Sequence, residues 1–311
     1  MNELLRRGHP PVLAGRREEP LRGLGLDLEQ RVATVDDADA LRRMVDGAAG
    51  VINTAGPFLD TGLPVASAAV AAGAHYLDVT AEQPAVELLC DRLDAAAAEA
   101  DVAVVPAMAF YGGLADLMVT RLLGDAAAAD EVTVAIGLDS WLPTAGTRLT
   151  GERNTMPRRV IRDGALVPLA SPEPTASWSF PRPVGEQEVV ELPFSEVLTL
   201  HRHLRIGRST SYLNTSSLAQ LRDESTPPPT LDDSRRSAQR FVVDVEVVVD
   251  GDTRRSSVSG RDIYASSAPL VVEAALRPAD GRGRAVGAVA PGQALDAAEL
   301  LDAADLTPSA G

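Results

Sequence analysis

Two short segments early in the chain carry residue types that could hold a nucleotide. Gly15 and Arg16 end a short apolar run, and a guanidinium at such a strand end can form paired hydrogen bonds with a ribose 2′-phosphate. In residues 53–58, small side chains and a glycine would let a ligand approach the backbone, and a proline restricts the turn. A solvated arginine and an ordinary βα turn are the alternatives. The candidate cofactor-binding residues are Gly15, Arg16, Asn53, Thr54, Ala55, Gly56, Pro57 and Phe58.

Side chains that could move a proton follow the next apolar runs. Asp78 and Glu82 flank a predicted strand end, where a carboxylate could relay a proton or anchor an amine. Tyr111 precedes two glycines and could donate a proton to a substrate. We interpret Asp78 and Tyr111 as candidate catalytic residues and Glu82 as a candidate substrate-binding residue. A turn acceptor and a packed core tyrosine are the alternatives for the first two.

The middle of the chain adds three candidate substrate-binding residues. Arg148 and Arg153 lie in the polar residues 140–154 and could hold a carboxylate or a phosphate, although a capped surface helix would also explain them. His201 and His203 would share one face of a strand, and His203 is a candidate for substrate binding. Two histidines without a third ligand make a poor metal site, so no metal is expected.

Composition excludes several kinds of chemistry. All 29 basic residues are arginines, so Schiff-base lysines, the P-loop lysine and a Tyr-x-x-x-Lys relay are ruled out. The net charge of −15 argues against a nucleic-acid partner. No apolar run approaches about 18 residues and no signal peptide opens the chain, so no membrane partner and a cytoplasmic location are expected. The single cysteine, Cys90, is predicted to be a buried apolar residue in a helix.

Strands and helices are predicted to alternate over the first 130 residues. Apolar runs without strict alternation, separated by helices, are typical of a parallel sheet covered on both faces. The sequence therefore predicts an α/β fold with a doubly wound, Rossmann-like parallel sheet. The predicted strands are residues 11–16, 31–35, 51–55, 75–80 and 102–107, and the predicted helices are residues 37–46, 63–72 and 84–100.

The rest of the chain changes character from residue 131. Residues 131–138 and 240–249 show the alternation of strands, and Pro-rich and Ser/Thr-rich connections lie between them. We predict a dinucleotide-binding domain over residues 1–130, rejoined by C-terminal helices at about residues 262–311. An α+β domain for substrate binding and dimerisation is predicted over residues 131–261.

A glycine-rich phosphate loop is not found before the first strand. In dinucleotide folds the residue that contacts the ribose lies about 20 residues beyond G-x-G-x-x-G, and this spacing from Arg16 reaches past Met1. Residues 1–8 look like the second half of the helix that follows such a loop. We expect either that the first strand and its loop precede these 311 residues or that the phosphate site has been lost.

Four segments together resemble the saccharopine dehydrogenase-like family of NADP-binding oxidoreductases, which includes proteins described as trans-acting enoyl reductases. They are residues 4–16, 50–58, 72–83 and 104–118, and Ala81 stands where family members usually have glycine. The resemblance implies NADP in preference to NAD, with Arg16 near the adenosine 2′-phosphate. It also implies that residues 54–58 run along the cofactor towards the nicotinamide, and that the second domain closes over the substrate and forms a homodimer.

The expected function is an NADP-dependent oxidoreductase that transfers a hydride to a C=N, C=O or activated C=C bond of a small metabolite. The alternative is a non-catalytic relic of the same fold that binds a metabolite or a partner after loss of the phosphate loop.

Overall fold

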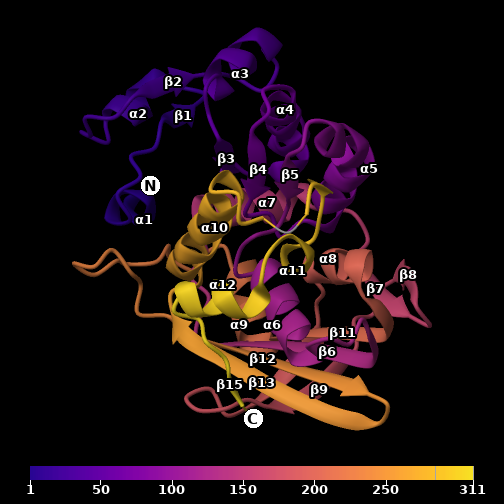
Figure 1. Cartoon of the computed structure of the whole chain (residues 1–311). Coiled ribbons are helices and arrows are strands. Elements are labelled where there is room, and N and C mark those ends of the chain that lie inside the picture. The colour runs from indigo at the N-terminus through magenta and orange to yellow at the C-terminus, as the bar shows by residue number, and fades with distance from the viewer. Residues whose placement is uncertain (284, 311) are drawn as a thin grey trace.

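A four-stranded parallel sheet forms the centre of the N-terminal half of the protein, which is described here from a computed structural model of residues 1–283 and 285–310 (Figure 1). Its strand order is β14-β5-β4-β3, so strands from both ends of the chain pair within it. The strands are β3 (Gly50–Asn53), β4 (His75–Asp78), β5 (Ala103–Val105) and β14 (Gly287–Ala288). The doubly wound parallel sheet predicted from the sequence is confirmed, because these strands are apolar and alternate with helices.

Two short parallel strands, β1 (Leu13–Gly15) and β2 (Gln30–Val32), form a separate sheet. In Figure 1 they lie above and to the side of β3, in the indigo part of the chain. Three helices accompany them: α1 (Asn2–Arg6), α2 (Glu18–Arg22) and α3 (Ala38–Val45). Within the described residues, neither strand pairs with the four-stranded sheet.

Helices α4 (Phe58–Ala71) and α5 (Gln83–Glu99) pack against each other and against the four-stranded sheet. Helix α4 begins five residues earlier than predicted, directly after Pro57, because Asp60, Thr61 and Gly62 interrupt the apolar pattern in its first turns. Cys90 is buried in α5 as predicted, and burial raises the pKa of its thiol to about 11.

A large mixed sheet forms the other half, at the bottom of Figure 1. Its strand order is β15-β13-β12-β6-β11-β10-β9, and the β7–β8 hairpin pairs with β11. The strands are β6 (Ala128–Leu138), β7 (Arg159–Arg162), β8 (Ala165–Pro168), β9 (Thr175–Ser179), β10 (Glu186–Glu191), β11 (Arg205–Asn214), β12 (Arg240–Val249), β13 (Asp252–Arg261) and β15 (Ser309–Ala310). This large sheet and the helices between its strands form the second, α+β part of the fold.

Several helices lie between the two large sheets. Helix α10 (Ile263–Ala279) packs on β3 and β4, and α6 (Gly113–Leu123) packs on β6 and β12. The remaining helices are α7 (Ala145–Arg153), α8 (Glu196–His203), α9 (Thr215–Arg222), α11 (Pro291–Ala294) and α12 (Ala297–Ala303). Among the described residues, no helix is both long and apolar enough to cross a bilayer.

The expectation that His201 and His203 alternate on a strand is wrong. Both lie in the last turn of α8, with Arg202 between them. Basic side chains are favourable there because the carbonyl end of a helix carries partial negative charge. Two residues spaced by one cannot distinguish a strand from a helix end, which is why the pattern misled.

Candidate functional site

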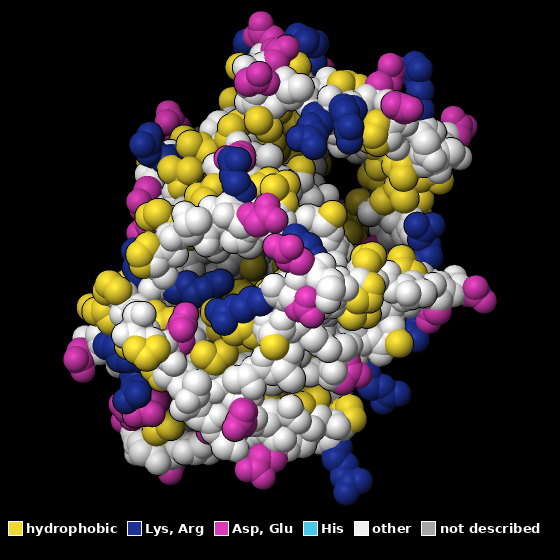
Figure 2. Space-filling view, turned by 180° about the vertical axis from the view of Figure 1, so that it is seen from behind, with side chains coloured by type: hydrophobic (Ala, Val, Ile, Leu, Met, Phe, Trp, Pro, Cys, Tyr) yellow, Lys and Arg dark blue, Asp and Glu magenta, His cyan; other side chains and the backbone are white. Residues whose placement is uncertain are grey.

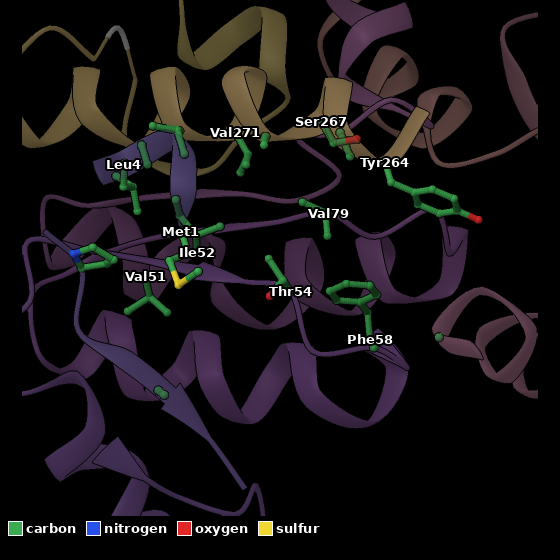
Figure 3. A pocket seen from close by; sticks show the side chains of 18 of the residues that line it. Met1, Leu4, Val51, Ile52, Thr54, Phe58, Val79, Tyr264, Ser267 and Val271 are labelled. Atoms are coloured by element: carbon green, nitrogen blue, oxygen red, sulfur yellow. The ribbon is translucent and has the colours of Figure 1, made fainter. Parts of the chain in front are cut away.

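A cavity of about 930 Å³ runs from β1 past the carboxyl ends of β3 and β4 to α7 and α10. Figure 3 shows its apolar wall, with Val51, Ile52 and Thr54 on one side and Val271 of α10 on the other. Ligands of open α/β sheets bind outside the carboxyl ends of the strands, and this cavity lies at that edge. Its size is in the range of small-molecule sites.

The turn between β3 and α4 forms one wall of the cavity. Thr54, Gly56 and Phe58 line it, whereas Ala55 and Pro57 do not. A Cβ on Gly56 would meet the Thr150 hydroxyl oxygen at 3.2 Å and the Phe58 ring at 3.4 Å. Glycine therefore lets α7 approach this turn closely, and the approach of a cofactor to the same backbone stays a prediction.

Glu82 ties this turn to the end of β4. Its Oε1 accepts a hydrogen bond of 2.8 Å from the Phe58 backbone N–H, at the first turn of α4. Its Oε2 is buried and has no hydrogen-bond partner among the described residues, although Glu82 lines the cavity. Burial raises the pKa of Glu82, partly offset by the N–H groups of Phe58 and Leu59. A buried carboxyl with one free oxygen can hold or transfer a proton.

Asp78 lies behind this wall and does not line the cavity. Its Oδ1 accepts from the backbone N–H groups of Ala107 at 2.8 Å and Thr80 at 3.0 Å, and its Oδ2 accepts from the Tyr76 hydroxyl at 3.0 Å. Burial raises the pKa of Asp78 to about 6, against the lowering effect of those three hydrogen bonds. Asp78 therefore joins the loops that follow β4 and β5.

Asn53 extends the same buried network. Its Nδ2 donates to the Tyr76 hydroxyl at 3.1 Å, and its Oδ1 accepts from the Ala55 backbone N–H at 3.0 Å. The side chain shapes the start of the turn from behind and does not line the cavity.

Tyr111 belongs to an aromatic cluster in the cavity wall. Its ring stacks on Trp141 with centroids 5.3 Å apart and packs on Phe194 at 4.4 Å. Its hydroxyl is buried without a hydrogen-bond partner among the described residues, and burial raises its pKa. Two buried polar atoms without partners, on Tyr111 and Glu82, thus belong to residues that line one cavity. Such atoms cost free energy unless a ligand or water satisfies them.

Tyr264 at the start of α10 holds α7 over the cavity. Its hydroxyl lies 3.0 Å from the Thr147 hydroxyl oxygen and accepts from the Trp141 indole N–H at 3.3 Å. In Figure 3 its ring and that of Phe58 lie on opposite sides of the space. The sequence analysis did not select Tyr264. In the structure it follows Asp262, whose side chain caps the start of α10.

Arg158 is a cavity residue that the sequence analysis also missed. Its guanidinium donates to the Pro193 carbonyl at 2.6 Å and lies 5.3 Å from the centroid of the Phe194 ring. Burial lowers its pKa, but an arginine remains charged. No local motif marks it, because its neighbours come from a segment more than thirty residues later.

Three predicted substrate-binding residues lie outside the cavity. Arg148 donates to backbone carbonyls of the segment that follows α9, and Arg153 pairs with Asp60 of α4 at 2.6 Å. His203 faces Asp116 at 3.2 Å. Burial opposes the charged form of His203, but Asp116 outweighs it and the pKa of the imidazole is raised. Their roles in substrate binding remain predictions.

The residues present fit both ends of a nicotinamide dinucleotide. Arg16 follows β1, is exposed and has no ion-pair partner among the described residues, so it is available to a phosphate. Gly15 ends β1 itself. At the other end, Thr54, Gly56 and Phe58 line a largely apolar wall beside the unpartnered oxygen of Glu82. That pairing of a dry wall with a few polar groups suits a nicotinamide and a small substrate.

A comparison with known families finds a match in the N-terminal part of the chain. Residues 4–105 match the family model described as the saccharopine dehydrogenase NADP binding domain. Among curated proteins, no sequence match was found.

Three solved structures are similar to this chain, and one of them has a TM-score above 0.5. Saccharopine dehydrogenase (L-Glu forming) from Saccharomyces cerevisiae has 13% identity and a TM-score of 0.62, over 94% of this chain and 90% of that chain. An amine dehydrogenase from Mycobacterium smegmatis has 12% identity and a TM-score of 0.45, with 94% and 91% covered. A probable dehydrogenase from Thermotoga maritima has 10% identity and a TM-score of 0.46, with 95% and 87% covered. The yeast protein therefore shows the fold of nearly the whole chain.

Proposed function

We propose that this protein, whose residues 4–105 match the family model of the saccharopine dehydrogenase NADP binding domain, is an NADP-dependent oxidoreductase that reduces a C=N, C=O or activated C=C bond of a small metabolite. The observation that carries the proposal is the pair of buried, unpartnered oxygens on Glu82 and Tyr111 in the cavity that the turn after β3 lines. The cofactor would supply the hydride, and the protein supplies orientation, exclusion of water and a proton.

Each cavity residue has a distinct proposed role. Thr54, Gly56 and Phe58 position the nicotinamide end of the cofactor, and Arg16 holds the 2′-phosphate at the adenosine end. Glu82 holds or transfers the proton that accompanies hydride transfer, since burial raises its pKa towards the range where a carboxyl can act as an acid.

The other polar residues bind or align the substrate. Tyr111 offers a hydroxyl hydrogen bond to the reacting group, and Arg158 offers a charged donor to a substrate anion. Asp78 acts as a positioning residue, because its Oδ1 joins the loops that carry Glu82 and Tyr111 and its Oδ2 accepts from Tyr76.

The proposal is tested first by titrating the full chain with NADPH and with NADH while following nicotinamide fluorescence. Micromolar binding of NADPH, with weaker binding of NADH, is the expected result. No binding of either nucleotide up to millimolar concentration would refute it and would favour a metabolite-binding protein without redox activity.

A second test uses Glu82→Gln, which keeps the acceptor for the Phe58 N–H and removes the proton. It should retain NADPH binding and lose about 100-fold or more in the rate of NADPH oxidation with an active carbonyl, imine or enoyl substrate. Glu99→Gln, at an exposed position of α5, is the matched control. Equal rates for both variants would remove Glu82 from the mechanism.

A further inference from the structure

The two ends of the cavity have different walls. At the end near β1, the molecule is hollowed below its upper right part in Figure 2, with hydrophobic side chains around the opening. The other end lies between the turn after β3, α7 and the start of α10. The chain has only two Trp, four Tyr and five Phe residues, yet six of these line the cavity. They are Phe58, Phe110, Tyr111, Trp141, Phe194 and Tyr264.

Four of these residues form a connected aromatic wall, which we define as Tyr111, Trp141, Phe194 and Tyr264. The Tyr111 ring packs on both Trp141 and Phe194, and the Trp141 indole N–H donates to the Tyr264 hydroxyl. Because these side chains hold one another in place, a ligand that binds to them orders few groups. Figure 3 shows Phe58 and Tyr264 on opposite sides of the space, so a flat group that enters between them meets aromatic rings on both sides.

The polar atoms of the aromatic wall are satisfied within the protein, with one exception. The Tyr264 hydroxyl accepts from the Trp141 indole and lies 3.0 Å from the Thr147 hydroxyl oxygen. The exception is the Tyr111 hydroxyl, which is buried and has no partner among the described residues. The wall therefore offers a ligand apolar ring surface and a single hydroxyl, which suits a flat apolar group.

Arg158 adds a positive charge beside this wall. In the part of the chain that the structure describes, no carboxylate forms an ion pair with its guanidinium, which donates to the Pro193 carbonyl at 2.6 Å. The carboxyl that attracts it most is that of Glu196, whose Oε1 already accepts from the Ser211 hydroxyl at 2.6 Å and the Phe194 N–H at 3.1 Å. A half-buried arginine without a carboxylate partner can take one from a ligand.

We propose that this end of the cavity binds an aryl carboxylate, a small metabolite whose aromatic ring packs against the aromatic wall and whose carboxylate pairs with Arg158. The guanidinium lies 5.3 Å from the centroid of the Phe194 ring, so the charge and the wall are adjacent. A small polar substrate without a ring would leave the aromatic surface in contact with water, which is unfavourable. The role of this ligand as the substrate rests on the proposed function, whereas its binding can be measured without a nucleotide.

The first experiment compares three ligands of the full chain by isothermal titration calorimetry. Hydrocinnamate carries a phenyl ring and a carboxylate, hexanoate carries the carboxylate without a ring, and hydrocinnamamide carries the ring without a charge. Hydrocinnamate should bind at least about 10-fold more tightly than either of the others. Equal affinity for hexanoate would remove the ring site, equal affinity for hydrocinnamamide would remove the carboxylate site, and no binding of hydrocinnamate up to millimolar concentration would overturn the whole proposal.

Repeating the titration in the presence of NADP⁺ separates this proposal from the proposed function. Hydrocinnamate should still bind, because a substrate must lie beside the cofactor. Competition between the two ligands would show that the aromatic wall holds the nicotinamide, and this would overturn the proposal. If the protein binds neither NADPH nor NADH, the proposed function fails, and the three ligands without nucleotide still decide whether an aryl carboxylate binds here.

Two arginine variants test the charge. Arg158→Gln removes the charge and should weaken hydrocinnamate binding about 10-fold while leaving hydrocinnamamide binding unchanged. Arg159→Gln is the matched control, because Arg159 pairs with Glu87 of α5 at 2.8 Å and does not line the cavity. It should change the affinity for neither ligand. Equal losses for the acid and the amide in Arg158→Gln would overturn the pairing of the carboxylate with Arg158.

Two phenylalanine variants test the ring. Phe194→Leu should weaken hydrocinnamate binding about 5-fold or more and hexanoate binding much less. Phe180→Leu is the matched control, because Phe180 is buried to a similar degree (5% exposed, against 6% for Phe194) in a separate cluster on the large sheet. Equal losses for the two ligands in Phe194→Leu would overturn the assignment of the ring to this wall.

The fluorescence of Trp141 locates the ring even if Phe194→Leu does not fold. The chain has two tryptophans, and Trp178 lies outside the cavity, so Trp178→Phe leaves Trp141 as the reporter. Hydrocinnamate should change its emission with the affinity found by calorimetry, and hexanoate should not. Unchanged emission, with binding still seen by calorimetry, would place the ring elsewhere and overturn the proposal.

Discussion

The pH dependence of stability should reveal the buried carboxyl of Asp78. Its pKa rises from 3.8 to about 6 on folding, chiefly because of burial. The folded state therefore binds the proton more tightly, and this contribution to stability is fully present below about pH 3.8 and is lost as the pH rises through 6. At 1.36 kcal/mol per pKa unit, the complete loss is about 3 kcal/mol.

Asp78→Asn removes this titration and keeps acceptors for the Ala107 and Thr80 N–H groups. The chain has a pI of about 4.7, so urea unfolding is best followed by tryptophan fluorescence between pH 5 and 7.5. Over that range the unfolding free energy of the unmodified protein should fall by about 1.4 kcal/mol relative to that of Asp78→Asn. The reason is that this free energy changes with pH only up to about pH 6, where Asp78 of the folded protein becomes ionised. The lost hydrogen bond to Tyr76 shifts the variant by a constant amount at every pH.

Asp91→Asn, at an exposed position on α5, is the control and should run parallel to the unmodified protein. The reasoning is refuted if the unfolding free energy of Asp78→Asn changes with pH in the same way as that of the unmodified protein. That result would mean that the Asp78 carboxyl ionises equally easily in the folded and unfolded chains. Curves that diverge in the opposite sense, with the unmodified protein gaining stability as the pH rises, would show that the hydrogen bonds outweigh burial.

Three further substitutions test the site and its support. Arg16→Ala should weaken NADPH binding about 10-fold or more and leave NADH unchanged, with the exposed Arg22→Ala as control; equal losses for both nucleotides would remove the 2′-phosphate assignment. Tyr111→Phe should change the unfolding free energy by less than about 0.5 kcal/mol, because its hydroxyl has no partner, yet slow NADPH oxidation; an unchanged rate would make it a packing residue only. Gly112→Ala should cost about 2 kcal/mol or more in thermal or urea unfolding, because Gly112 has φ +132° and a Cβ would lie 2.9 Å from the Ala107 carbonyl oxygen. Gly151→Ala, which meets nothing within 4 Å, should cost nothing.

The parallel sheet of the N-terminal half could be predicted because buried strands are short apolar runs with helices between them. The same reasoning located the turn at Gly56 and the loops that hold Glu82 and Tyr111, since strand ends are local features. Helix boundaries were less accurate where polar residues and glycine interrupt the first turns, as in α4. The two histidines near residue 202 were misjudged because a spacing of two fits both a strand and a helix end.

By itself, the sequence determined which segments bury themselves and which chemistry is open to a chain without lysine. Only the tertiary structure decided which polar groups share one cavity. It brought Arg158 and Tyr264 to the site from distant segments and used Arg148 and Arg153 to hold the chain together elsewhere. The physical reason is that apolar burial is encoded along the chain with a short period, whereas contacts between polar groups depend on how whole elements pack.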